Sequence, residues 1–141
     1  MNFHKIQLTP MGKQLTVHTV EQGKLEKITF AMLGKTPFGI EEFGGQNYIN
    51  WEIDDDMVEL LLTVEQNFAQ ELTSNYDSYK SWSFKSSVKG KEEYTKLLRT
   101  KNKCSKEIQP HILYSVTITL DSIWLHKKNK MFGIMWHTTF V

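Results

Sequence analysis

Several short segments of this chain alternate apolar and polar residues, which is the pattern of a β-strand that buries one face. Residues 27–32, 48–53 and 113–120 all have this pattern. In the second of these segments Ile49, Trp51 and Ile53 share one face, and Tyr48, Asn50 and Glu52 share the other. We therefore expect several strands that turn alternate side chains toward a common core.

A single segment has helical periodicity. Its apolar residues recur every three or four positions: Met57, Leu61, Val64, Phe68 and Leu72. We expect one helix from the Asp54–Asp56 run to about Ser74, because aspartates cap free amides and complement the positive end of the helix dipole. The same carboxylates could bind a divalent cation, but that would need ligands from elsewhere in the chain.

The C-terminal third predicts a long hairpin, with strands over residues 113–125 and 131–141 and a turn at 127–130. Shorter strands are expected over residues 5–9, 14–20, 79–86 and 93–101, with turns at Pro10–Gly12 and 88–91. Five to seven mostly antiparallel strands and one long helix predict a mainly β fold. A small OB-type barrel capped by the helix fits this order, and a plain α+β sandwich is the alternative.

The composition narrows the function classes. The 141 residues fit one domain, in which residues 1–26 form an N-terminal strand extension. Cys104 is the only cysteine, which excludes a disulfide framework and predicts a reducing, intracellular compartment. No apolar run is long enough to cross a membrane, and no signal peptide is visible.

The sequence gives no support for an enzyme. The five histidines are scattered singly, and neither a P-loop nor a dinucleotide-binding glycine pattern is present. We therefore expect no cofactor and no metal. A nuclease that uses a metal held by Asp54–Asp56 is the weakest alternative, and loss of metal-dependent cleavage in Asp55→Asn would identify it.

The formal net charge is only +1, but the charges are unevenly distributed. Residues 54–79 contain seven acidic residues and no basic one, whereas residues 80–107 contain nine basic residues and three acidic ones. A smaller basic cluster occupies the turn at 127–130. Lysine-rich segments are often only solvated loops, yet the local field rather than the total charge attracts a polyanion.

Aromatic residues are interleaved with these cations. Proteins that bind single-stranded nucleic acid combine cations for phosphates with exposed rings on which bases stack. The candidate phosphate contacts are Lys80, Lys85, Lys96, Arg99, Lys101 and Lys127. The candidate stacking residues are Tyr79, Trp82, Tyr94 and Trp124. Aromatic residues in strands are usually core, so we expect Phe30, Trp51 and Trp136 to be buried and about two of the four candidates to be free for stacking.

Several short motifs occur in the same order in this chain as in a known group of proteins. They are Pro37–Ile40, Tyr48–Ile53, the helix with an acidic start, Leu97–Lys101, Ile123–Trp124 and Phe132–Trp136. This order resembles a group of OB-fold proteins of large double-stranded DNA viruses that are thought of as single-stranded-DNA-binding proteins. It spans roughly residues 28–141. The closing strand ends in His137-Thr138-Thr139, where the group usually has a lysine, so one phosphate contact that the resemblance implies has no matching lysine here.

The resemblance implies a role in viral DNA replication, recombination or repair. It implies replication proteins as partners and a location at replication sites in the host cytoplasm or nucleus. Together with the basic and aromatic residues it predicts a sequence-independent single-stranded-DNA-binding protein, with RNA as an open alternative ligand. A second hypothesis is a viral structural or protein-interaction module that forms homo-oligomers through a sheet edge; a salt-insensitive oligomer would distinguish it.

Overall fold

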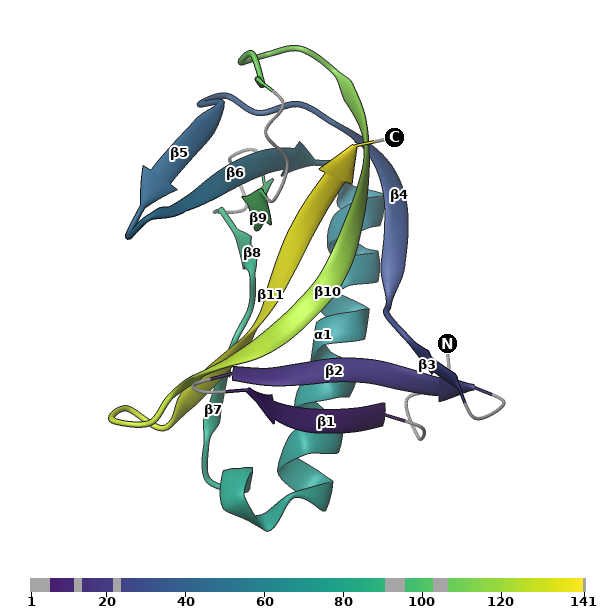
Figure 1. The fold of residues 1–141 in the computed structure, drawn as a ribbon, viewed down its shortest axis with the longest axis vertical. Helices are drawn as coiled ribbons and strands as arrows, with labels where there is room; N and C mark the ends of the chain where they lie inside the picture. Colours follow the sequence, from purple (N-terminus) through teal and green to yellow (C-terminus); the bar gives the residue numbers. More distant parts are fainter. Residues whose placement is uncertain (1–5, 12–13, 22–23, 91–95, 103–106, 141) are drawn as a thin grey trace.

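The computed structural model describes residues 6–11, 14–21, 24–90, 96–102 and 107–140. Within these ranges the fold is mainly β with one long helix, as predicted, and its eleven strands are connected in one sheet (Figure 1). The elements are β1 (Ile6–Met11), β2 (Gln14–Glu21), β3 (Lys24–Glu26), β4 (Thr29–Gly34), β5 (Ile40–Phe43), β6 (Gln46–Ile53), α1 (Asp55–Asn75), the short 3-10 helix η2 (Asp77–Tyr79), β7 (Ser83–Lys85), β8 (Val88–Lys89), β9 (Lys96–Asn102), β10 (Tyr114–His126) and β11 (Met131–Phe140).

The sheet is mixed. Most neighbours are antiparallel, including β10 with β11 and β6 with β9. However, β7 and β9 run parallel to β11, so the prediction of antiparallel strands is wrong at these two pairings. The reason is that β11 is not the next strand in the chain after either of them. Apolar periodicity shows which residues form a strand, but it does not show the direction of a distant neighbour.

Strand β10 joins the two ends of the molecule. Its first half pairs with β4 and its second half with β2, and a bulge between Leu120 and Ser122 separates the halves. The hydrogen-bonded strands follow an open path, β1-β2-β10-β11-β9-β6-β5. Strand β4 pairs with β10 on the edge opposite β11. A single bridge then links the end of β4 to β6, where the Glu52 amide donates to the Lys35 carbonyl at 2.7 Å.

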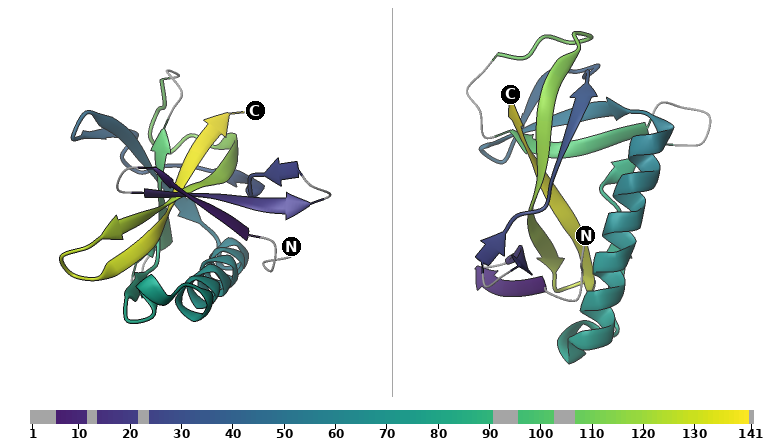
Figure 2. Two further views of the ribbon diagram at one scale, coloured as in Figure 1. Left: turned by 60° about the horizontal axis from the view of Figure 1, so that its bottom comes forward. Right: turned by 90° about the vertical axis from the view of Figure 1, so that its right-hand side faces the viewer.

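Helix α1 runs along one side of the sheet, as the right-hand view of Figure 2 shows. The Asp54 carboxylate accepts a hydrogen bond from the Met57 amide at 2.8 Å, which confirms the predicted cap. The predicted apolar stripe is also confirmed, with Met57 only partly buried and the other members buried: Leu61, Val64, Phe68 and Leu72. Glu65, one of the seven acidic residues of the segment 54–79, is buried beside them.

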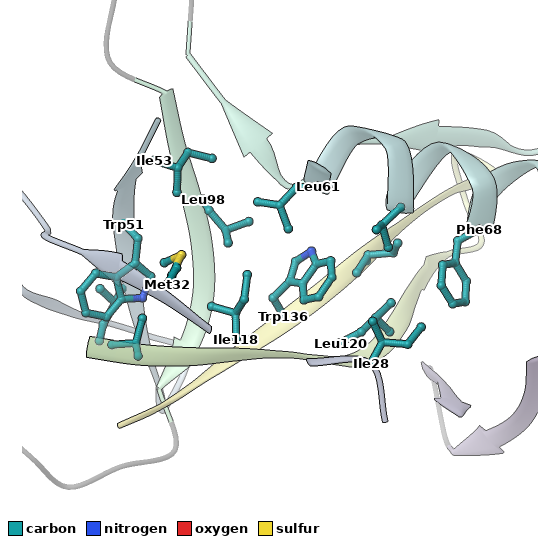
Figure 3. Packing of buried hydrophobic residues seen from close by; sticks show 14 of the residues in the cluster. Ile28, Met32, Trp51, Ile53, Leu61, Phe68, Leu98, Ile118, Leu120 and Trp136 are labelled. Atoms are coloured by element: carbon teal, nitrogen blue, oxygen red, sulfur yellow. The ribbon is translucent and has the colours of Figure 1, made fainter. Parts of the chain in front are cut away.

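The core extends along the inside of the sheet. In Figure 3 Trp136 lies between Trp51 at one end and Phe68 of α1 at the other. Trp51 and Trp136 are fully buried, as predicted, whereas Phe30 is only partly buried, with its ring 6.0 Å from that of Trp136. The Trp51 indole donates to Thr100 and Thr138 hydroxyls at 3.2 and 2.8 Å, so its polar atom is satisfied inside the core.

Two predicted turns are partly strand. β1 continues through Met11, and Pro10 pairs with Leu15 of β2, because an edge strand tolerates a residue that has no amide hydrogen. Val88 and Lys89 form β8, which pairs with β9. This second difference brings Lys89 into the sheet beside Arg99 of β9, where it bears on function.

Candidate nucleic-acid interface

Strand β9 separates its polar and apolar residues by face. Leu98 and Thr100 are buried, whereas Arg99 and Lys101 lie on the face that points away from the core. On β6 the residues opposite them in register are Asn50 and Tyr48, which also point away from the core. The outer face of β6 and β9 therefore carries two cations beside an aromatic ring and an amide.

Arg99 lies against Tyr48. Its guanidinium carbon is 4.2 Å from the centre of the Tyr48 ring, a cation–π contact. On the next position of β6, the Asn50 side chain donates to the Glu41 carboxylate at 2.9 Å. Glu52 of the same strand forms an ion pair with Lys35 at 3.6 Å. Glu41 and Glu52 thus have partners of their own, whereas Arg99 and Lys101 of β9 are in none of the ion pairs of the described residues.

The link between β7 and β8 is anchored to the buried Glu65 of α1. Glu65 accepts hydrogen bonds from the Ser86 hydroxyl at 2.6 Å, from the Ser87 hydroxyl and from the Ser87 amide at 3.3 Å. The Trp136 indole donates to the same carboxylate at 3.3 Å. These bonds fix the Ser86–Ser87 backbone, and with it the positions of Lys85 and Lys89 on either side.

These segments line a half-open hollow of about 250 Å³, which we call the cationic pocket. Its lining contains three cations, two hydroxyls, an indole and two apolar side chains: Lys85, Ser86, Ser87, Lys89, Arg99, Trp124, Ile134 and Met135. The residues come from β7, the β7–β8 link, β8, β9, β10 and β11. An anion with an attached ring is the ligand type that matches such a lining.

The three cations of the pocket repel one another. Partial burial lowers the pKa of the Lys89 ammonium below its ordinary value, and the neighbouring charges of Arg99 and Lys85 lower it further. Among the ion pairs of the described residues, none involves these three side chains. A bound anion would supply the negative charge that none of the described residues lining the pocket carries.

Trp124 forms the aromatic wall of the pocket. It pairs with Gly133 of β11, and Gly133 in turn pairs with Lys85 of β7. The half-buried indole lies directly over Gly133, so closely that a side chain on that residue would collide with it. One row across three strands thus places the ring of Trp124 and the ammonium of Lys85 on the same face of the sheet.

The structure brings some of the sequence-predicted residues together and separates others. Lys85, Arg99 and Trp124 line the cationic pocket, and Lys101 follows Arg99 along the outer face of β9. Lys96 points to the opposite face, beside Ile53, and donates to the Gly90 carbonyl at 3.3 Å. Lys127 is exposed on the turn between β10 and β11 and does not line the pocket.

The remaining predicted residues lie elsewhere. Lys80 forms an ion pair with Asp77 at 2.8 Å, next to η2. Tyr79 and Trp82 pack edge to face, 5.1 Å between ring centres, and both are half-buried against the core. Tyr94 lies outside the described residues. His137, in the three-residue segment where the group usually has a lysine, is buried and hydrogen-bonded to the Asp121 carboxylate at 3.1 Å.

Sequence reasoning missed three contributors to the site. Lys89 was assigned to a turn, Tyr48 was treated only as an outward residue of its strand, and Glu65 was counted only as one of the seven acidic residues of 54–79. The spacing of Glu65 was an available signal, because it directly follows Val64 and lies three residues before Phe68 in the apolar stripe.

No family model, no curated protein and no solved structure matches this chain. In the parts of the chain that the structure describes, no helix is long and apolar enough to cross a membrane. Within the same ranges, no three His, Cys, Asp or Glu side chains are grouped as metal ligands would be.

Proposed function

We propose that this chain is a sequence-independent single-stranded-DNA-binding protein. The observation that carries the proposal is the cationic pocket, in which Lys85, Lys89 and Arg99 converge beside the ring of Trp124. Cations for phosphates and a ring for bases are the two groups that such proteins combine. Neither group distinguishes one base from another, so the binding is independent of sequence.

The strand order supports an OB-type barrel. When the Lys35–Glu52 bridge is included, β4, β6, β9, β10 and β11 form a ring. Numbered in chain order, these five strands follow one another around the ring as 1-2-3-5-4-1. Oligonucleotides bind to OB-folds on the face of strands 2 and 3 and on the loops beside it. Here strands 2 and 3 are β6 and β9, which carry Tyr48, Arg99 and Lys101.

The charge distribution narrows the path of the DNA. Glu41 and Glu42 of β5 are in none of the ion pairs of the described residues, so their negative charges would repel phosphates. Lys101, Arg99, Lys89 and Lys85 lead instead along β9 to the pocket. We propose that the single-stranded DNA follows these cations and that one of its bases stacks on Trp124. Replication, recombination or repair of viral DNA is the setting implied by the resemblance of the motifs.

A fluorescence titration tests the proposal. Oligothymidylate at low salt should quench the emission of Trp124, and the affinity should fall steeply as salt rises, because bound cations release counterions from the phosphates. Trp124→Phe should remove most of the quenching, since Trp51 and Trp136 are fully buried and Trp82 packs against Tyr79 outside the pocket. Absence of binding at low salt would refute the proposal, and tighter binding of oligouridylate would assign the protein to RNA.

The second candidate is a module that oligomerises through a sheet edge. Its support is β5, an edge strand whose Phe43 is 71% exposed. The neighbouring Glu41 and Glu42 carry charge on the same short strand, which disfavours pairing with a second copy. Light scattering distinguishes the two functions: an oligomer that persists at high salt and dissociates in Phe43→Ser would favour the edge.

A further inference from the structure

We propose that the cationic pocket binds a terminal phosphomonoester of a nucleotide chain, with the last base stacked on Trp124. This inference rests on the proposed function and makes it more specific. The terminal nucleotide of a DNA strand can carry a phosphomonoester, which has more negative charge than an internal phosphodiester. The pocket is a small hollow lined by three cations, whereas the outer face of β9 is open.

Size is the first argument. A hollow of about 250 Å³ is smaller than the roughly 300–1,000 Å³ of pockets that hold drug-sized ligands. The hollow is open on one side, and its volume suits one nucleotide-sized group. The open face of β6 and β9 can accommodate several consecutive nucleotides from the interior of a DNA strand.

Charge is the second argument. An internal phosphodiester carries one negative charge, whereas a phosphomonoester carries about 1.5 to 2 at neutral pH and offers three acceptor oxygens. Lys85, Lys89 and Arg99 all line the one hollow, and none of them is in an ion pair of the described residues. Three cations are more completely neutralised by the dianion than by a single phosphodiester.

The donors of the pocket are also restricted. The hydroxyls of Ser86 and Ser87 donate to Glu65, and the Ser86 oxygen accepts from the Val88 amide at 3.1 Å. Their hydrogens are therefore committed to the protein. Recognition of an anion depends on the ammonium and guanidinium groups, which form charge-assisted hydrogen bonds. This favours the ligand with the greater charge.

Trp124 supplies the place for the last base. Its indole is fixed against Gly133 of β11, and Gly133 pairs in turn with Lys85 of β7. A ring held in this way needs no further ordering when a base stacks on it. A phosphate among the three cations and a base on the indole can belong to the same terminal nucleotide, because both groups line the same pocket.

Calorimetric titrations with three oligothymidylates of one length, roughly eight nucleotides, test the inference. One carries a 5′-phosphate, one a 3′-phosphate, and one neither. We expect one phosphorylated oligonucleotide to bind about tenfold more tightly than the unphosphorylated one, from at least one additional charge-assisted hydrogen bond. An unphosphorylated oligonucleotide that is one nucleotide longer controls for added charge and should gain much less.

Variants locate the preference. Lys89→Gln, and separately Arg99→Gln, should abolish the preference for the phosphorylated end, and circular dichroism would verify that both variants fold. Lys80→Gln is the matched control, because Lys80 is exposed, paired with Asp77 and outside the pocket. It should keep the preference. A preference that persists in both pocket variants would overturn the inference.

The outcomes separate this inference from the proposed function. Equal, salt-sensitive affinities for all three oligonucleotides would overturn the inference and leave the proposed function standing. If no oligonucleotide binds, the proposed function fails, and thymidine monophosphate tests the pocket alone. Saturable binding of the monophosphate but not of thymidine, lost in Lys89→Gln, would support a phosphomonoester site for a free nucleotide. No binding of the monophosphate would then overturn the inference as well.

Discussion

The indole of Trp124 lies directly over the backbone of Gly133, its cross-strand partner. A β-carbon on Gly133 would stand only 2.6 Å from the indole nitrogen. The glycine is thus required here by the close approach of a ring, not by a turn. This contact determines where the ring lies relative to Lys85, the neighbour of Gly133 on β7.

Gly133→Ala should therefore displace the indole. We expect a loss of about 1–3 kcal/mol in the free energy of unfolding, because the added methyl group overpacks the contact. Oligonucleotide affinity should fall with it, since the ring leaves its place in the pocket. Urea denaturation and fluorescence titration measure the two effects.

A double-mutant cycle isolates the contact. In a Trp124→Ala background the ring is absent, so the same Gly133→Ala substitution should cost much less stability than in the wild type. Equal costs in the two backgrounds would show that the glycine is required for a reason other than the indole.

Glu65 should be among the polar residues that stability depends on most. Glu65→Ala removes the acceptor of hydrogen bonds from Ser86, Ser87 and Trp136, and leaves buried donors unsatisfied. We expect a loss of about 3 kcal/mol in the free energy of unfolding, by urea denaturation, and a smaller loss for Glu65→Gln. Glu59→Ala on the exposed side of the same helix is the matched control. Similar losses for Glu65→Ala and Glu59→Ala would contradict the role of the buried carboxylate.

Lys89 makes the stability of the protein depend on pH. Its lowered pKa means that, between this value and the ordinary 10.5, the unfolded chain binds more protons than the folded one. The free energy of unfolding therefore rises with pH in that window, and below the window the full cost of burial and repulsion is present.

Lys89→Gln removes this cost. The variant should be more stable than the wild type at neutral pH, and the difference should shrink as the pH approaches 10.5. Urea denaturation of both proteins at a series of pH values measures the difference. A difference that stays constant from about pH 7 to about pH 10 would show that Lys89 is not responsible.

The contact between Arg99 and Tyr48 should contribute to binding. Tyr48→Leu removes the ring that orients the guanidinium and should weaken oligonucleotide binding about threefold, the equivalent of an exposed cation–π contact. Tyr48→Phe keeps the ring and should bind as the wild type does. Fluorescence titrations of the two variants compare them, and equal affinities would exclude the aromatic face as the cause.

The strands and the helix could be predicted because their signals are local. The alternation of Ile49, Trp51 and Ile53 identified the inner face of β6, and Asp54 identified the start of α1. The parallel pairing of β9 with β11 could not be predicted, because it depends on strands that are distant in sequence.

The site could be predicted only in part for a similar reason. Trp82 and Trp124 both lie in segments with cations nearby, yet one packs with Tyr79 against the core and the other lines the pocket. The indole of Trp124 lies over Gly133, its partner across the hairpin, and this pairing is not visible in the local sequence around Trp124. The sequence indicated that basic and aromatic residues form a surface. Which of these residues line the pocket depends on how the strands pair.

The salt dependence of DNA binding tests the central claim most directly. The logarithm of the oligothymidylate association constant should fall linearly with the logarithm of salt concentration, by about 0.7 for each phosphate contacted. A variant with Lys85→Gln, Lys89→Gln and Arg99→Gln should bind weakly, with a slope reduced by at least about 0.7. The control removes three cations that all form ion pairs, Lys27, Lys35 and Lys80, and should keep the wild-type slope. Equal slopes in the two triple variants, or no binding by the wild type at low salt, would contradict the claim.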